Sequence, residues 1–313
     1  MFIIPDALRH GPFTRAEGLA AGVPARVLEG TQFVRIHQGV HCHRGHVMSW
    51  ADRVEAARLA LPASARTTGA TRLQQLGLDH GWRDVLHFVV QGDLHLELEG
   101  VFLHRTVAML AHDDAGVTPE VAFVAYCAEA RVLDAIKVGC VLLHQDRLDL
   151  DLLEQLLVEQ PWRRVCAEAR WVLCHLDHRC RSLPEAELLA LVRFAGLPEP
   201  EVNKTIDLGA GDILTPDLWF EDYGLAVEYE GRQHQEDRGQ YNADIDRYKL
   251  YRRTGTAYEQ VTKERMRSPK ATVRQIHRAL VDRGYCGPPP DFGELWASLF
   301  APVAAVVRPG RAA

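Results

Sequence analysis

Hydrophobic and polar residues along this chain recur with two periods, the period of 3.6 residues typical of helices and the period of two typical of strands. In the first fifty residues a helical pattern covers 15–21, and a second short helix has Pro24 in its first turn. Two alternating strands follow in FVRIHQGVHCH, around the turn Gln38-Gly39. Thr14 and Glu17 have the spacing of a capping box, in which two side chains satisfy free amides of a helix's first turn.

The order helix, turn, helix and hairpin is that of a winged helix, a common DNA-binding arrangement. We therefore predict a winged-helix DNA-binding domain over 1–50. Arg26 in the second helix and Arg35 in the hairpin are placed to meet phosphates or base edges. Short helix pairs also occur in many proteins that bind no DNA, so the pattern alone does not decide the function.

Residues 51–160 contain both helical and strand periodicities and predict a mixed α/β middle domain without a recognisable set of catalytic residues. The predicted elements are a helix over 51–61, a short helix over 68–78, strands within 87–93 and 94–104, and helices over 104–112, 118–128, 130–143 and 148–158.

From Pro161 the pattern predicts a third, compact α/β domain over 161–285. Its predicted elements are helices over 162–176 and 182–195, a Pro-rich turn over 196–203, strands within 204–209, 213–220 and 223–231, a basic helix over 240–253, a strand over 257–262 and a helix over 269–283. A C-terminal extension, 286–313, is expected to be partly disordered, with disorder from residue 301. The fold class is thus a multi-domain α/β protein, α+β overall.

Charge is distributed unevenly along the chain. The net charge is −6, but the segment from Arg232 to Arg283 holds 13 Lys and Arg against 7 Asp and Glu, which leaves it at +6 and the remainder at −12. A basic segment on an acidic body is compatible with a local surface for nucleic-acid phosphates. Solvated helix faces would give the same count, so charge alone leaves both interpretations open.

The composition also bears on the compartment. Seven cysteines, odd in number and scattered, argue against a disulfide framework and for a reducing cytoplasm. No apolar stretch approaches the roughly 18 residues that span a bilayer, so no membrane partner is expected. The first residues, MFIIPDALRH, do not have the pattern of a secretory signal. The groups CHLDHRC at 174–180 and HCHRGH at 41–46 lack the paired spacing of structural zinc sites, so core packing is the favoured interpretation.

The segment LAVEYEGRQH, 225–234, carries the main candidate chemistry. On a strand, Glu228 and Glu230 share one face with Ala226, and two such carboxylates repel unless a cation lies between them. An antiparallel neighbour could bring Asp217 beside Glu228. With the carbonyl of Tyr229, these carboxylates would form an all-oxygen site suited to Mg²⁺ or Mn²⁺. The alternative is a pair of glutamates on a solvated strand end.

The residues Pro216-Asp217 followed by Glu228-Tyr229-Glu230 resemble the core of the PD-(D/E)XK nuclease superfamily. The continuation EYEGRQH, then Tyr241, Asp244 and Arg247, is similar to very-short-patch-repair-like endonuclease domains of actinobacterial proteins. The N-terminal helices and FVRIHQGV resemble the winged-helix domain of AbiEi-type antitoxins.

The resemblance implies a restriction-endonuclease-like domain at 161–285 with defined site residues. Asp217 and Glu228 would be metal ligands, and Glu185 would complete or flank the metal site from the preceding helix. Gln233 and His234 would line the site, with His234 available for proton transfer or a phosphate contact.

One position departs from the superfamily pattern. Glu230 stands where the superfamily has a lysine that stabilises the attacking water and the transition state. Lys249, Arg247 or Arg232 could supply that positive charge and contact DNA phosphates. A second metal could replace it, or the domain could have lost its activity.

We therefore expect a cytoplasmic bacterial DNA-binding protein with a Mg²⁺-dependent endonuclease domain. The alternative is a non-catalytic, antitoxin-like repressor with a degenerate nuclease-like domain, with a cognate toxin or another protein as its partner.

Overall fold

The structure is a computed structural model that describes residues 2–81, 83–209, 211–230 and 249–306. The chain forms two compact units, Met1–Tyr126 and Cys127–Ala313, and the boundary falls inside the predicted middle domain. Helices and mixed sheets are both present, in agreement with the predicted α/β class. The three-domain division itself stays a prediction.

The first unit begins with a helix pair and a three-stranded sheet. Its elements are η1 (Asp6–Leu8), β1 (Pro12–Thr14), α1 (Arg15–Ala20), α2 (Ala25–Leu28), β2 (Phe33–His37) and β3 (Val40–His43). The sheet has the order β1-β3-β2 and is antiparallel, so the predicted hairpin is confirmed and gains β1 as a third strand. Phe13, Leu28 and Phe33 belong to the small apolar core. The capping box is also confirmed, since Thr14 Oγ1 accepts from the Glu17 amide and Glu17 Oε2 accepts from the Thr14 amide.

The rest of this unit is a second three-stranded sheet with its helices. The elements are α3 (Trp50–Ala60), β4 (Arg66–Thr67), α4 (Gly69–Gln75), β5 (Leu86–Gln91), β6 (Val101–Thr106) and α5 (Pro119–Cys127), which crosses the unit boundary. The prediction of a helix over 104–112 is wrong. Residues 101–106 form β6, which pairs in parallel with β5, and 107–112 are not helical. Ladder pairing with a distant strand outweighs local helix preference there.

The second unit opens with four helices, α6 (Val132–His144), α7 (Leu150–Glu159), α8 (Cys166–Leu173) and α9 (Leu183–Phe194). α6 packs against α8 and α9. The helix predicted over 162–176 is shorter than expected, because Val165 has a left-handed backbone (φ 59°) and α8 starts only at Cys166. The prediction for α9 is confirmed, with Ser182 as its N-cap.

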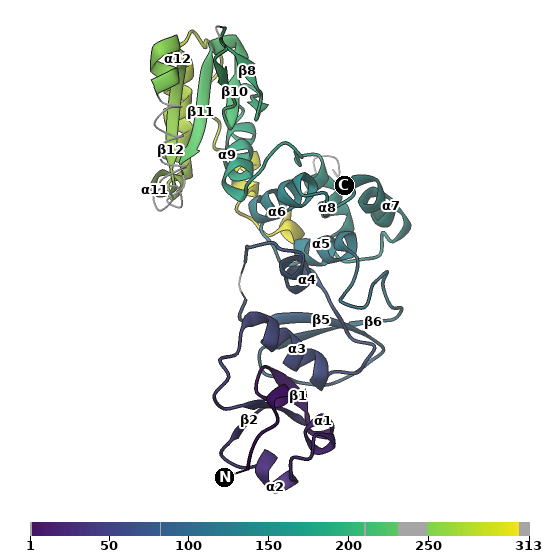
Figure 1. The fold of residues 1–313 in the computed structure, drawn as a ribbon. Helices are drawn as coiled ribbons and strands as arrows, with labels where there is room; N and C mark the ends of the chain where they lie inside the picture. The colour runs from purple at the N-terminus through teal and green to yellow at the C-terminus, as the bar shows by residue number, and fades with distance from the viewer. Residues whose placement is uncertain (1, 82, 210, 231–248, 307–313) are drawn as a thin grey trace. The chain divides into compact units, whose positions relative to one another are not determined.

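A four-stranded mixed sheet follows α9, with the order β12-β11-β10-β7. Three of its strands, β12, β11 and β10, are labelled in Figure 1. Its strands are β7 (Glu201–Val202), β10 (Leu218–Phe220), β11 (Leu225–Glu230) and β12 (Ala257–Thr262). β11 pairs antiparallel with β10 and parallel with β12, and residues 249–254, between β11 and β12, are helical. The prediction of a turn over 196–203 missed β7, whereas β8 (Ile206–Asp207) and β9 (Ile213–Leu214) form a separate hairpin.

A short 3-10 helix, η2 (Glu221–Tyr223), connects β10 with β11. After β12 the chain continues with α11 (Lys263–Met266), α12 (Pro269–Asp282), α13 (Glu294–Ser298) and η4 (Val303–Ala305). α12 packs against β11 and β12 through its apolar face, which includes Val273, Ile276 and Leu280. Disorder from residue 301 was expected, but 301–306 are ordered: the Val303 amide donates to the Ala130 carbonyl (2.9 Å) and Val303 is fully buried.

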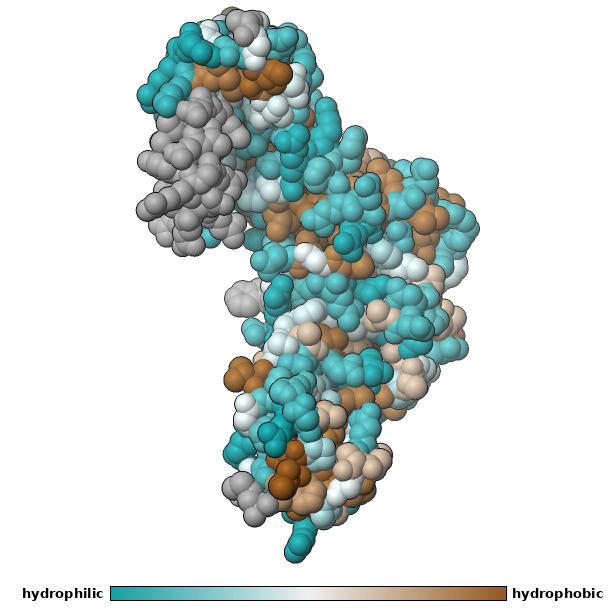
Figure 2. All heavy atoms as spheres, in the orientation of Figure 1, coloured by the Kyte–Doolittle hydropathy of each residue, from teal (hydrophilic) through white to brown (hydrophobic). Residues whose placement is uncertain are grey.

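On the face drawn in Figure 2, hydrophilic residues cover most of the described surface, with hydrophobic patches between them. None of the helices in the described part of the chain has the length and apolar character required to traverse a bilayer.

The capping box at α1 gives a stability prediction. Thr14→Ala removes the oxygen that accepts the Glu17 amide and should lower the free energy of unfolding by about 1 kcal/mol. Urea unfolding followed by circular dichroism measures the change. Thr31→Ala, at an exposed position without a cap, is the control and should change stability by much less. Equal losses in the two variants would contradict a capping role for Thr14.

Candidate functional site

The antiparallel pair β10–β11 brings Asp217 and Glu228 together. Leu218 pairs with Val227, and continuing this register by one residue places Asp217 opposite Glu228. Residues opposite each other in a ladder point to the same face of the sheet. The predicted antiparallel pairing is confirmed, and its register puts these two carboxylates, eleven positions apart in the chain, on one face of the sheet.

Glu228 is a buried carboxylate, with 2% of its surface exposed. It follows Ala226 on the face where Ala226, Trp219 and Tyr251 form an apolar cluster. Tyr251, from the helical residues 249–254, donates its hydroxyl hydrogen to Glu228 Oε1 at 2.6 Å, and its ring stacks on Tyr258 at 4.8 Å. A charge in such surroundings needs hydrogen-bond donors, and Tyr251 supplies one.

Asp217 is half-buried and is oriented by backbone contacts from both neighbouring segments. Its Oδ2 accepts the amide of Tyr229 at 2.7 Å, and its own carbonyl accepts the amide of Asn203 at 3.1 Å. These contacts fix the Asp217 side chain toward β11. The Tyr229 side chain itself points to the opposite face, where burial and the nearby Glu187 and Glu264 raise its pKa.

Glu185 lies in the first turn of α9, where Ser182 caps the helix. Its Oε2 accepts from the Asn203 side-chain amide (2.7 Å) and from the Arg181 backbone amide (2.9 Å). Because Asn203 also donates its backbone amide to the Asp217 carbonyl, one residue connects Glu185 with Asp217.

The sequence analysis did not identify Asn203 and Tyr251 as site residues. Asn203 has φ 49°, a left-handed conformation that asparagine tolerates better than most residues, so an asparagine directly after a strand was an available signal. Tyr251 offered no such signal, because a tyrosine in a basic helix is compatible with many roles.

Glu230 has a different environment from Glu228. It is half-buried, pairs with Thr262 across the parallel ladder, and accepts a hydrogen bond from the side-chain amide of Gln260. Gln260 is neutral, so this contact does not replace the positive charge of the superfamily lysine.

The remaining predicted site residues divide into two groups. Arg232, Gln233, His234 and Arg247 lie outside the described residues, so their roles stay predictions. Lys249 is exposed on the helical residues 249–254, and Arg26 and Arg35 are exposed in the first unit.

The oxygen atoms at this end of β11 fit a hard cation in their chemistry. Carboxylates of Asp217 and Glu228 with the carbonyl of Tyr229 are the oxygen ligands that Mg²⁺ and Mn²⁺ prefer. In the part of the chain that the structure describes, Glu185, Asp217 and Glu228 do not form a group of three whose oxygens all lie within 4.8 Å. Glu185 therefore flanks the carboxylate pair, held there by Asn203.

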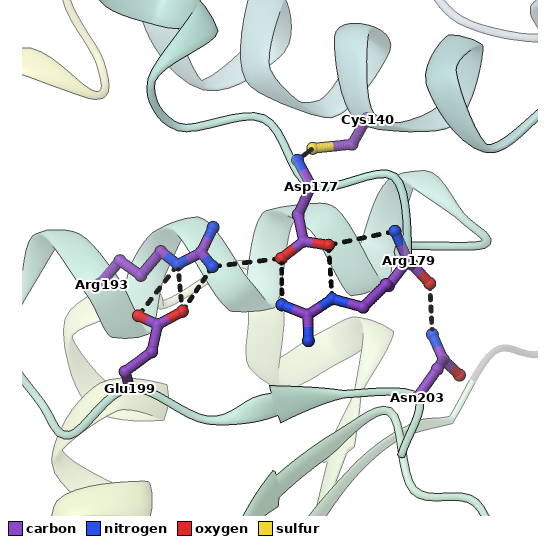
Figure 3. Close-up of polar contacts among 6 residues, drawn as sticks. All are labelled: Cys140, Asp177, Arg179, Arg193, Glu199 and Asn203. Carbon is purple, nitrogen blue, oxygen red and sulfur yellow. Dashed lines mark hydrogen bonds and ion pairs between the residues drawn. The ribbon is translucent and has the colours of Figure 1, made fainter. Parts of the chain in front are cut away.

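An ion-pair network around the buried carboxylate of Asp177 holds the loop that precedes α9 (Figure 3). The carboxylate of Asp177 accepts two hydrogen bonds from the Arg179 guanidinium (2.9 and 2.8 Å) and one from Arg193 (3.2 Å). Arg193 also pairs with Glu199, and the Arg179 carbonyl accepts from the Asn203 side chain (2.8 Å). Asn203 thus joins this network to Glu185.

Burial alone would raise the pKa of Asp177, but the hydrogen bonds and charge of Arg179, together with the charge of Arg193, hold it below its ordinary value. The nearby Cys180 is buried, and His175 packs between Trp171 and Phe194. The expectation that Cys174 packs in the core on a helix is wrong: α8 ends at Leu173, and Cys174 is exposed. Burial, aided by Arg193, lowers the pKa of His175.

A scan of protein-family models finds no match to this chain, and a search of curated proteins finds no relative. The resemblance to the PD-(D/E)XK superfamily therefore rests on the residues described above.

The Asp177 network gives a pH-dependent prediction. Asp177→Asn should lower the free energy of unfolding at pH 7 by about 3 kcal/mol, the lower end for breaking a buried ion pair, because Arg179 keeps some contact with water. Since the pKa of folded Asp177 is lowered, its stabilisation is complete above about pH 4 and is lost as the pH falls through the folded value. Urea unfolding between pH 7 and about pH 3 should show the two proteins converging. Asp222→Asn, at an exposed position, is the control; a loss of stability in Asp177→Asn that does not depend on pH would contradict the ionic role.

The Tyr251–Glu228 hydrogen bond gives a second prediction. Tyr251→Phe should lower the free energy of unfolding by about 1.5 kcal/mol, because it removes a donor to a buried carboxylate. Thermal and urea unfolding measure the effect. Tyr223→Phe is a matched control, since within the described residues Tyr223 contacts Arg283 through its carbonyl and Tyr285 through its ring, and its hydroxyl makes no hydrogen bond to Glu228. A neutral Tyr251→Phe substitution would show that Glu228 does not depend on this hydrogen bond.

Proposed function

We propose that this protein binds DNA and that its C-terminal sheet carries a Mg²⁺- or Mn²⁺-dependent phosphodiester-hydrolysing site. The proposal rests on one observation, the register of β10 and β11, which places Asp217 opposite Glu228 on one face. Neighbouring carboxylates in a partly buried position repel, and a divalent cation is the usual means of relieving that repulsion.

The order of elements around the carboxylates supports the proposal. A helix (α9) precedes three strands of one sheet (β7, β10 and β11), and a helical segment then leads to the parallel strand β12. The sequence also predicted helix, three strands, helix and strand, although its first strand, within 204–209, corresponds to β8 of the separate hairpin and not to β7. Because unrelated activities share folds, the carboxylates and not the topology must carry the functional conclusion.

Asp217 and Glu228 would hold the metal. A bound divalent ion activates water and stabilises charge on a phosphodiester undergoing in-line displacement. The chain's own contribution is positioning: the Tyr229 amide orients Asp217, the Tyr251 hydroxyl orients Glu228, and Asn203 fixes Glu185 beside them. Lys249 is an exposed positive charge on the same helical segment as Tyr251 and would contact the DNA backbone.

The N-terminal helix pair and hairpin would supply DNA recognition. Arg26 and Arg35 are exposed on α2 and β2, the two elements that a winged helix uses to contact DNA. Contacts to phosphates would position the protein, and any sequence preference would come from base contacts by these elements.

The alternative function is a non-catalytic repressor with an antitoxin-like role and a cognate toxin or other protein partner. The observation in its favour is Glu230, whose carboxylate is bonded to neutral Gln260 at the position of the superfamily lysine. A domain that kept its fold but lost that positive charge would bind DNA without cutting it.

Cleavage assays separate the two functions. With plasmid, single-stranded DNA or RNA and Mg²⁺ or Mn²⁺, the wild-type protein should cut at least one substrate, and EDTA should abolish the reaction. Asp217→Asn and Glu228→Gln should each lower the rate by about a hundredfold or more, since losing a metal ligand exceeds the 10–100-fold effect of losing its outer partners. Asp222→Asn, three residues before β11, is the control and should keep full activity.

If wild type and both variants are equally inert on all substrates, the hydrolytic function is wrong. DNA binding by the same inert protein, abolished by Arg26→Gln with Arg35→Gln, would then favour the repressor.

A further inference from the structure

A stripe of positive charge runs along the outer face of α12. Lys270, Arg274 and Arg278 recur every four residues, so at 100° per residue they fall within a sector of about 80°. This sector lies on the side of the helix away from its buried face. The three side chains are exposed and, within the described residues, none of them has a carboxylate partner. From Lys263 to Asp282 the chain carries six Lys and Arg against two Asp and Glu.

Aromatic rings from the following segment lie beside the start of this stripe. Phe292, Trp296 and Phe300 recur every four residues, with ring centroids 4.9 Å apart for the first pair and 5.7 Å for the second. The Lys270 ammonium and the Arg274 guanidinium lie over the Phe292 ring, 5.4 and 5.1 Å from its centroid. Cations and aromatic faces therefore form one continuous surface.

A pocket opens at this junction. Its volume is about 370 Å³, and it is lined by Pro269, Lys270, Phe292, Trp296, Ala297 and Phe300. The volume lies within the range of small-ligand pockets. Trp296 is almost fully buried and forms part of the pocket wall, whereas Phe300 is 37% exposed. The wall is apolar and aromatic, and Lys270 adds a positive charge at its edge.

We propose that this surface binds single-stranded nucleic acid, with one unpaired base in the aromatic pocket and the adjoining phosphates along Lys270, Arg274 and Arg278. The aromatic wall fits the π-face of any base, and the cationic stripe fits the backbone beside it. A base within a duplex is stacked and paired and cannot enter such a pocket. An acidic peptide would meet the same charges, but its carboxylates would gain nothing from the aromatic wall. The inference rests on the proposed function in that nucleic acid is the partner.

Fluorescence anisotropy with a labelled oligothymidylate, in EDTA so that no cleavage occurs, tests the surface. Lys270→Gln with Arg274→Gln should weaken binding and lower the slope of log K against log salt by about 0.7 for each phosphate that is no longer neutralised. Phe300→Leu should weaken binding by roughly 5- to 150-fold, which corresponds to the loss of one stacked base, and Phe300→Trp should keep it. Arg170→Gln, which removes an exposed charge from α8, is the control. Urea unfolding verifies that each variant is folded.

A purely structural role for Phe300 would lower stability in Phe300→Leu and leave affinity unchanged, which would overturn the proposal. Duplex binding that Phe300→Leu weakens as much as single-strand binding, or binding of polyglutamate that these substitutions also abolish, would overturn it as well and indicate a backbone-only or an acidic-protein partner. The binding assay needs no metal, so a negative result in it is distinct from a negative result in the cleavage assay. Cleavage that Asp217→Asn abolishes could persist in a protein that lacks this binding surface. Conversely, binding at this surface could persist in a protein that does not cut.

Discussion

The pairing of β10 with β11 is the constraint on which the C-terminal unit depends, because it places Glu228 in a nearly closed environment beside Asp217. An ionised carboxylate without partners would cost several kcal/mol there. The Tyr251 hydroxyl offsets part of that cost, and Tyr251 reaches Glu228 only because the chain crosses from β11 to the parallel strand β12 through a helical segment. Strand register, crossover and buried charge are therefore mutually dependent.

The two faces of β11 carry different side chains. The face of β11 with Ala226 and Glu228 carries the polar groups that could hold a cation, whereas Val227 and Tyr229 face the other way. Glu185, in the first turn of α9, is held by a hydrogen bond from the Asn203 side chain. Asn203 also donates to the carbonyl of Arg179, which belongs to the ion-pair network around Asp177. Glu185 also lies in the first turn of α9, where a carboxylate interacts favourably with the helix N-terminus, so these contacts stabilise the helix start as well.

Prediction from the sequence succeeded where local rules dominate. Thr14 and Ser182 identified helix starts, because capping involves residues only a few positions apart. It failed where distant pairing decided the conformation. Residues 105–106 continue β6 beyond the strand predicted within 94–104, because β5 offers a parallel ladder, and Glu201–Val202 become β7 because β10 pairs with them. Both partner segments were predicted as strands, within 87–93 and 213–220, but the segments that they pair with could not be identified from the local pattern, since ladder bonds join segments far apart in the chain.

The sequence by itself determined the alternation that puts Glu228 and Glu230 on one face, and it singled out Asp217 as their neighbour, because side-chain direction along a strand has a fixed period of two. Only the tertiary structure decided that the two glutamates differ: the first is buried against Tyr251, and the second is half-buried against Gln260. The aromatic pocket beside Lys270 was likewise decided by folding. It combines α12 with a segment that starts ten residues after that helix ends, and no local pattern encodes such packing.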